Sequence, residues 1–271
     1  MALDDGRPTT DGSRSRSPLG GGVMVAPAPP AGDGRRKLKT SERVAVELVR
    51  DIAARGLSSG DRLPLEAAML EEYGVSRASL REALRLLEVQ GLIVIRPGPR
   101  GGPVVGTVDP AHLAHTATLY FHLGAYTYRE LFEAQVRLEP VCAELAARHD
   151  DRLLVRRTME PFLARNGVQG PRAYRDAYVR FHQGIYVLAG NGVLTLLARA
   201  VTHVVTNHVV ATMEPVELRP AIVDEHRALA EAVIAGRAAL AYRLMEHHFA
   251  QQLDFYKRRW PSRFDEVIEW R

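Results

Sequence analysis

Arginine recurs at every fourth position in one short stretch of the sequence, at Arg77, Arg81 and Arg85, directly after Ser76. A spacing of four places side chains on one face of an α-helix, and serine is a residue type that caps a helix start. Guanidinium groups neutralise phosphate and pair with guanine. Arginines on a helix are often merely solvated, so the elements around them must decide whether they bind nucleic acid.

Those elements have the order of a helix-turn-helix. A helix is expected over residues 65–73, ending at Gly74, which suits a left-handed turn. A second helix over 77–90 carries an apolar stripe spaced for burial, namely Leu80, Ala83, Leu84 and Leu87. The N-terminal end of such a second helix is the part that enters the major groove of DNA.

A preceding helix and a following hairpin complete the pattern. Residues 42–55 predict a helix capped by Ser41, with Val49 on its apolar face. The apolar runs 92–95 and 104–105 predict two strands, joined by a turn-rich segment that contains Gly98 and Arg100. Three helices and a hairpin are the order of a winged helix, and a glycine-rich tip with one arginine suits close approach to DNA.

The whole chain divides into four segments. Residues 1–36, rich in Gly, Pro, Ser and Arg, predict a disordered tail, and 37–107 form the winged-helix domain. Residues 108–258 read as successive helices with short connections, which predicts an antiparallel all-helical bundle. Residues 259–271 are taken as a C-terminal tail. The fold class is therefore mainly α, with a small β wing.

Composition sets further bounds. The net charge of +4 on 271 residues only hints at an anionic partner, so the placement of the arginines carries the DNA-binding prediction. One cysteine, Cys142, excludes a disulfide framework and is expected to be a small buried residue. The sequence shows neither a secretion signal nor an apolar run of membrane-spanning length, so we expect a cytoplasmic protein without a membrane partner.

The N-terminal block resembles the DNA-binding domain of the GntR family of bacterial transcription regulators. The resemblance rests on the segments Gly60–Pro64, Tyr73–Arg77, Leu80–Arg85 and Gly91–Ile93, with Glu66, Leu87 and Glu88. It implies DNA contacts by Arg62, Ser76, Arg77, Ser79, Arg81 and, in the wing, Gly98. Two positions depart from the family pattern: Leu65 stands where a serine cap is usual, and Ala67 where several relatives carry arginine.

The helical block resembles the ligand-binding (FCD) domain of the FadR-like branch of that family. The resemblance rests on the segments Glu130–Ala134, Leu138–Pro140, Phe181–His182, Gly190–Asn191 and Glu225–Leu229, with Ala232, Val233, Gly236, Ala241, Met245 and His248. It implies a divalent metal, Zn²⁺, Ni²⁺ or Mn²⁺, held by an Asp and by His182, His226 and His248. If the chain reverses at Gly236, His226 and His248 lie about 15 and 18 Å from the turn, at nearly one level.

Two departures affect this second site. Tyr178 occupies the position of the expected Asp, so the three histidines would hold a metal with water or an effector, or the site has become metal-free. Gln135 stands where relatives often carry an arginine that pairs with an acidic effector, and Arg137 faces elsewhere on the helix. With Tyr178 and Gln135 assigned to the effector pocket, the expected effector is a small organic acid or a larger acyl compound.

The helix-turn-helix predicts a regulator that binds double-stranded operator DNA rather than an enzyme. The resemblance implies that it is a homodimeric repressor, in which residues 108–258 bind a small-molecule effector and form the dimer. One alternative is a metal-dependent hydrolase built on the three histidines, although no general-base carboxylate has a clear spacing to them. The other alternative is a sequence-neutral architectural DNA binder.

Overall fold

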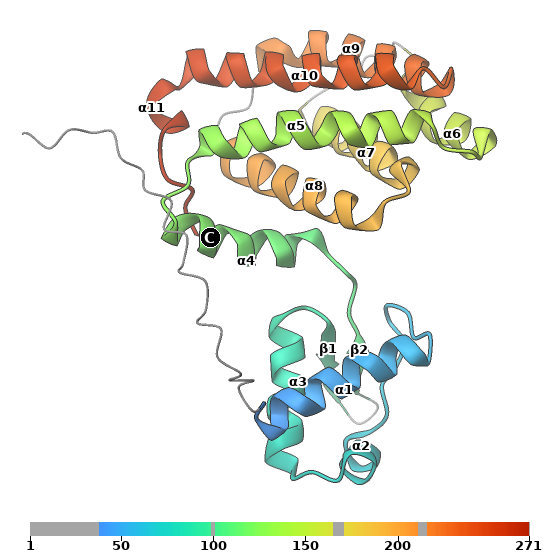
Figure 1. Cartoon of the computed structure of the whole chain (residues 1–271), viewed down its shortest axis with the longest axis vertical. Coiled ribbons are helices and arrows are strands. Elements are labelled where there is room, and N and C mark those ends of the chain that lie inside the picture. The colour runs from blue at the N-terminus through green and yellow to red at the C-terminus, as the bar shows by residue number, and fades with distance from the viewer. Residues whose placement is uncertain (1–37, 99–100, 165–170, 211–215, 271) are drawn as a thin grey trace, which may run out of the picture. The chain divides into compact units, whose positions relative to one another are not determined.

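The computed structural model describes residues 38–98, 101–164, 171–210 and 216–270. The predicted disordered tail, residues 1–36, and the wing residue Arg100 lie outside the described residues. The described chain forms a winged helix and a bundle of helices, which are considered separately below (Figure 1). This agrees with the mainly α fold class expected from the sequence.

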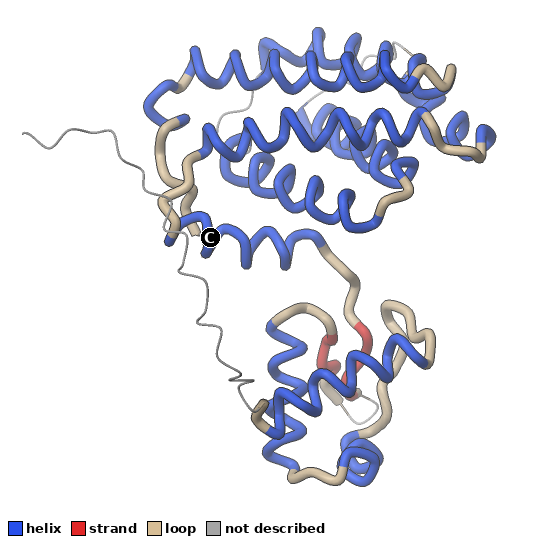
Figure 2. Tube along the Cα trace, in the orientation of Figure 1, coloured by secondary structure: helices blue, strands red, loops and turns tan. Residues whose placement is uncertain are grey.

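Three helices and a two-stranded sheet make up the N-terminal part, as Figure 2 shows by colour. Its elements are α1 (Thr40–Ala54), α2 (Glu66–Tyr73), α3 (Arg77–Val89), β1 (Ile93–Arg96) and β2 (Gly102–Val105). The strands pair antiparallel, with Ile93 opposite Val105 and Arg96 opposite Gly102. Their core is a cluster of apolar residues from α1, α2, α3 and β1 that includes Leu48, Met69, Leu80 and Ile93.

The helix-turn-helix forms as its residue types predict. Gly74 ends α2 in the left-handed region, with φ of 59°. Ser76 caps α3, and its hydroxyl oxygen accepts the Ser79 backbone N–H at 3.2 Å. The predicted stripe on α3 is buried throughout, and it comprises Leu80, Ala83, Leu84 and Leu87.

The start of α1 differs from the prediction. The helix begins at Thr40, and the side chain of Glu42 accepts the backbone N–H of Lys39 at 2.8 Å, so Ser41 is not the cap. Val49 is 41% exposed, whereas Val44 is buried. The buried face of α1 is therefore rotated from the expected one, because α1 packs chiefly against α3.

The C-terminal part is a bundle in which α5 and α10 run side by side over most of their length (Figure 1). Its long helices are α4 (Pro110–Leu123), α5 (Tyr128–Ala147), α7 (Pro171–Ala189), α8 (Gly192–Val205), α9 (Arg219–Ile234) and α10 (Ala238–Arg259), and its short ones are α6 (Arg152–Met159) and α11 (Pro261–Phe264). A large apolar core joins α5, α7, α9 and α10 through residues such as Phe181, Leu229 and Met245. Gly236, with φ of 69°, lies where α9 turns back into α10.

The last residues of the chain pack on the bundle, although they were expected to form a tail. Phe264 and Ile268 are buried, and the Ile268 N–H donates to the Tyr126 carbonyl at 2.8 Å. Val267 forms a β-bridge with Thr127 at the start of α5. Burial of these two apolar side chains is what orders the segment.

Arg152, the first residue of α6, joins the ends of two other helices. Its guanidinium donates to the Ala147 carbonyl at the end of α5 at 3.1 Å. It also donates to the carbonyls of Val233 and Ile234 at the end of α9, at 3.0 and 2.6 Å. The last carbonyls of a helix have no partner within the helix, so one cation satisfies orphan acceptors of two helices.

Helix α8 changes its winding before the predicted end of the segment. Residues Thr206–Val210 form a π-helical turn, where the sequence predicted a continuous helix through residue 212. A π turn holds an extra residue, and such turns are frequent at functional sites. The stretch Gly192–Val210 has the length and composition of a membrane span, so the expectation that no apolar run reaches that length is wrong. In this structure the stretch packs against α4 and α5.

Candidate functional site

The exposed face of the helix-turn-helix carries the residues predicted to contact DNA. Arg77, at the first turn of α3, is exposed and forms no ion pair with the described residues. Arg81 is also exposed, but its Nε donates to the Glu66 carboxylate of α2 at 3.1 Å. Arg77 is therefore available to contact DNA directly, whereas Arg81 must first break its ion pair with Glu66.

The wing lies beside a short segment that contains Arg62. The N–H of Leu63 donates to the Pro103 carbonyl at 3.0 Å, and Arg62 forms a β-bridge with Val104. This pairing sets Arg62 along β2, with its side chain exposed. Gly98 has φ of 101°, a conformation that favours glycine, at the start of the wing tip.

The two departures from the family pattern lie at the start of α2. Leu65 is the N-cap residue, is 69% exposed and makes no side-chain cap. Ala67 is exposed and, as an alanine, offers no polar contact. The first turn of α2 is thus left without a serine cap and without an arginine for phosphate.

Within the bundle, His182 of α7, His226 of α9 and His248 of α10 meet in one buried group, called here the histidine cluster. One ring nitrogen from each lies within 4.8 Å of those of the other two. The ring centroids of His226 and His248 are 4.9 Å apart, as the equal distance from the turn at Gly236 predicted. Three imidazoles this close have the donor set and spacing of a metal site.

Several nitrogens of the cluster have no hydrogen-bond partner among the described residues. They are both ring nitrogens of His182 and the Nε2 atom of His226. Burial and the neighbouring imidazoles lower the pKa of His226 well below its ordinary value of 6.5. Burial also lowers the pKa of His248, partly opposed by Glu225. Neutral imidazoles with unused lone pairs are the form that binds a metal.

Two carboxylates lie beside the cluster, although neither has a sequence spacing that would have assigned it to all three histidines. The Glu225 Oε2 atom lies 2.6 Å from His248 Nδ1. Glu139, fully buried on α5, has Oε2 at 3.8 Å from His182 Nδ1. Its other oxygen accepts hydrogen bonds from Thr202, at 2.7 Å, and from Tyr186. The Glu225 carboxylate is thus placed to orient the imidazole of His248, as carboxylates behind metal-binding histidines commonly do, whereas Glu139 lies beyond hydrogen-bond distance of His182.

Tyr178, which replaces the expected aspartate, covers the cluster with its ring. Its centroid lies 4.6 Å from that of His182 and 5.4 Å from that of His226. Its hydroxyl donates to Gln252 Oε1 at 3.4 Å. Burial raises the pKa of the Tyr178 phenol well above its ordinary value, so the hydroxyl stays protonated and is a poor metal ligand.

Gln135 lies behind the pocket walls rather than on them. It is buried on α5, and its amide donates to the Thr202 hydroxyl at 3.0 Å. Thr202 itself lines a cavity, so Gln135 acts on that cavity through its neighbour. Arg137 is exposed and donates to the Glu133 carbonyl of its own helix.

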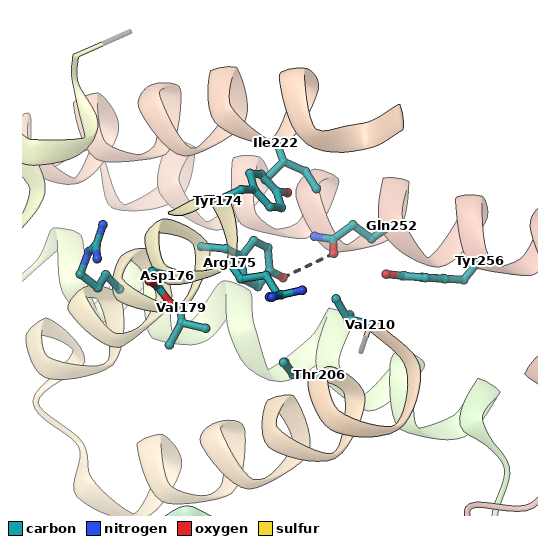
Figure 3. A pocket seen from close by; sticks show the side chains of 11 residues that line it. Tyr174, Arg175, Asp176, Val179, Thr206, Val210, Ile222, Gln252 and Tyr256 are labelled. Atoms are coloured by element: carbon teal, nitrogen blue, oxygen red, sulfur yellow. Dashed lines mark hydrogen bonds between the residues drawn. The ribbon is translucent and has the colours of Figure 1, made fainter. Parts of the chain in front are cut away.

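Two cavities flank Tyr178. The tyrosine pocket, of about 300 Å³, is bordered by α7, α9, α10 and the π turn, and Figure 3 shows Gln252 and Tyr256 across from Thr206 and Val210. It is lined by Tyr174, Arg175, Asp176, Tyr178, Val179, Arg180, Thr206, Val210, Ile222, Gln252 and Tyr256. The polar pocket, of about 270 Å³, is lined by Asp109, Pro110, Tyr178, Val179, His182, Gln183, Tyr186, Arg199, Thr202, His203, Thr206 and Asn207. They share Tyr178, Val179 and Thr206.

Sequence reasoning missed four residues around this site: Glu139, Arg199, Glu225 and Gln252. Glu225 adjoins His226, and Gln252 follows His248 by one helical turn, so local spacing offered a signal for both. Glu139 and Arg199 offered none, because their neighbours come from other helices. Arg199 lines the polar pocket, half-buried, and forms no ion pair within the described part of the chain.

Comparisons with known proteins match both parts of the chain. The family model of bacterial regulatory proteins of the gntR family matches residues 40–101, and that of the FCD domain matches residues 130–251. An uncharacterised HTH-type transcriptional regulator of Mycobacterium tuberculosis is 30% identical over 77% of this chain and 86% of its own. A putative L-lactate dehydrogenase operon regulatory protein of Escherichia coli is 28% identical over 78% and 84%.

A third relative matches over a shorter region. The Uxu operon regulator of Haemophilus influenzae is 37% identical over 40% of this chain and 39% of its own length. Among solved structures, GntR of Streptococcus agalactiae has the same fold, with a TM-score of 0.59 and 23% identity over 79% of this chain and 99% of its own. With its helix-turn-helix, wing and helical domain, the chain belongs to the GntR family of bacterial transcription regulators and carries an FCD domain.

Proposed function

We propose that this regulator is a cytoplasmic repressor that binds operator DNA as a homodimer and is controlled by a divalent metal and a small organic ligand in its FCD domain. The observation that carries the proposal is the histidine cluster, a group of three buried imidazoles with uncommitted nitrogens beside the polar pocket, which His182 lines. Buried polar atoms without partners destabilise the folded state. The stability of the bundle therefore does not explain why three histidines are buried together.

DNA recognition is assigned to α3 and the wing. Arg77 and Ser79 are set at the N-terminal end of α3, which a recognition helix inserts into the major groove. Arg62 and Gly98 would contact the DNA from the segment beside β2 and from the wing. Two copies of this unit would read two half-sites of a near-palindromic operator.

The metal would be held by His182, His226 and His248. The fit rests on their partnerless nitrogens and on the two carboxylates behind them. When bound, Zn²⁺, Ni²⁺ or Mn²⁺ would supply a Lewis-acid anchor for an oxygen of the ligand. Tyr178 would contribute a ring that excludes water from one side of the cluster rather than a ligand atom.

The ligand class follows from the pocket walls. Arg199 in the polar pocket would pair with a carboxylate, and the tyrosine pocket offers three tyrosine rings and several aliphatic side chains for an apolar portion. Because the pockets share lining residues, one elongated molecule would occupy both. We therefore favour an acyl or aryl carboxylic acid. It would regulate by binding the DNA-competent and the incompetent arrangements unequally.

The hydrolase alternative receives no support from the relatives, which are named as transcription regulators. The architectural alternative is decided by one experiment. Fluorescence anisotropy with the gene's own upstream DNA and with a scrambled duplex is measured over a range of salt concentrations. A regulator binds the former in specific excess over a salt-dependent background. Equal affinity for both duplexes would contradict the proposal that the protein is a sequence-specific regulator.

The metal part is tested separately. Elemental analysis of protein purified without added metal is compared between wild type and His226→Ala. We expect the wild type to retain one divalent ion per chain and the variant to lose it. Equal metal content in both proteins would reject the ligand assignment and leave the DNA-binding part intact.

A further inference from the structure

Helix α10 carries two neighbouring histidine–glutamine pairs with the same spacing. His247 and Gln251 are exposed, with Gln251 Nε2 at 3.3 Å from His247 Nε2. His248 and Gln252 are buried, with Gln252 Nε2 at 2.8 Å from His248 Nε2. Both pairs lie on the same helix and have the same sequence separation. They differ in that only the buried pair includes a residue of the histidine cluster.

The hydrogen positions in the buried pair follow from its neighbours. His248 Nδ1 lies 2.6 Å from the Glu225 carboxylate, which only accepts, so Nδ1 carries the hydrogen. A neutral ring then has its lone pair on Nε2, and Gln252 must donate an amide hydrogen to it. The hydroxyl of Tyr178 donates to the other end of the amide, Oε1, which is consistent with that orientation.

That lone pair is the one that a metal would use. With Nδ1 engaged by Glu225, Nε2 is the atom of His248 left for coordination. A metal ion and the Gln252 amide hydrogen cannot occupy the same lone pair. The amide therefore competes with the ion, whereas the Nε2 atom of His226 has no such competitor among the described residues.

We propose that Gln252 sets the metal affinity of the histidine cluster, by occupying the His248 lone pair until a ligand in the tyrosine pocket draws its amide away. The inference rests on the metal site of the proposed function and adds the residue that couples it to the pocket. Gln252 and Tyr178 both line the tyrosine pocket, and Gln252 faces Thr206 across it (Figure 3).

The coupling requires a particular ligand chemistry. A carboxylate or carbonyl oxygen in the tyrosine pocket would accept the Gln252 amide hydrogen and release His248 Nε2. Ligand and metal would then bind more tightly together than alone, and each would raise the affinity of the other by the same factor. Gln252 is thus a positioning residue that acts through His248.

The test measures zinc affinity of the full chain by competition with a chromophoric chelator. Gln252→Leu removes the amide and should bind Zn²⁺ about 2- to 10-fold more tightly than wild type, the equivalent of one ordinary hydrogen bond. Gln252→Met keeps the approximate length of the side chain and has no hydrogen to donate, so it should also bind more tightly. The matched control, Gln251→Leu, should leave zinc affinity unchanged.

A second readout follows the imidazole directly. In metal-free protein, the ¹⁵N resonance of His248 Nε2 should shift in Gln252→Leu and stay in place in Gln251→Leu. If Gln252→Leu fails to fold, the zinc affinity of Gln252→Met tests the inference instead. Unchanged or weaker zinc binding in both Gln252 variants would overturn the inference while leaving the metal site standing. Absence of zinc binding in every protein would remove the metal site and the inference together.

Discussion

The two functional regions of this chain present their chemistry in opposite ways. On the winged helix, Arg77 is exposed and depends on a few local features, such as the Gly74 turn and the Ser76 cap. In the bundle, the histidine cluster is buried and depends on side chains from several helices, among them Glu139 of α5 and Glu225 of α9. A surface site is thus defined by spacing along one helix, and a buried site by contacts between helices.

The largest expected effect is on the free energy of unfolding, and it tests whether the two regions unfold independently. Leu80→Ala truncates a fully buried side chain of the winged-helix core and should lower that region's free energy of unfolding by about 2–5 kcal/mol. Denaturant unfolding followed by hydrogen exchange should show loss of protection in α1–α3 and none in the bundle. Equal loss in both regions would mean that they unfold as one unit.

The next effect concerns DNA. Arg77→Ala should weaken binding to the operator by about 1–3 kcal/mol, the usual contribution of a bidentate arginine–guanine pair, and should leave zinc affinity unchanged. The matched control is Arg156→Ala, an exposed arginine on α6 of the bundle. Anisotropy titrations provide the measurement. An equal loss of affinity for a scrambled duplex would mean that Arg77 contacts phosphate rather than a base.

A smaller effect on zinc affinity is expected from the carboxylate that orients His248. Glu225→Gln weakens the partner of His248 Nδ1 and should lower zinc affinity about 10-fold, as is common for carboxylates that orient histidine ligands. The neighbouring Asp224→Asn is the control, because the ion pair of Asp224 with Arg227 lies outside the cluster. If both variants bind zinc like wild type, Glu225 does not orient the ligand.

The last prediction concerns pH and uses Cys142, the one cysteine in the chain, which lies in the bundle. Burial raises the pKa of its thiol from 9.0 to about 12. The unfolded chain therefore loses this proton first, and the free energy of unfolding should fall as pH rises from about 9 towards 12. Iodoacetamide should label the native protein slowly at pH 8, and Cys142→Ala should lack this part of the pH dependence.

The same contrast explains what the sequence could predict. The helix-turn-helix follows from Gly74, Ser76 and the α3 stripe, because each acts within a few residues of its own position. The exposed Val49 was misjudged because the buried face of α1 depends on α3. The histidine cluster was predicted from the family resemblance, and the spacing about Gly236 supported only His226 and His248. Glu139 was not predicted, since its partners Thr202 and Tyr186 lie more than forty residues away. The π turn at Thr206–Val210 has no local sequence signal that we recognise.

The hydrogen bonds of Arg152 have a mechanical consequence for the bundle. They hold the ends of α5 and α9 together at one point, so separating these ends requires breaking hydrogen bonds of a single guanidinium group. Ile222, which borders the tyrosine pocket, lies near the opposite end of α9. The restraint from Arg152 therefore acts on the end of α9 that is farther from the pocket.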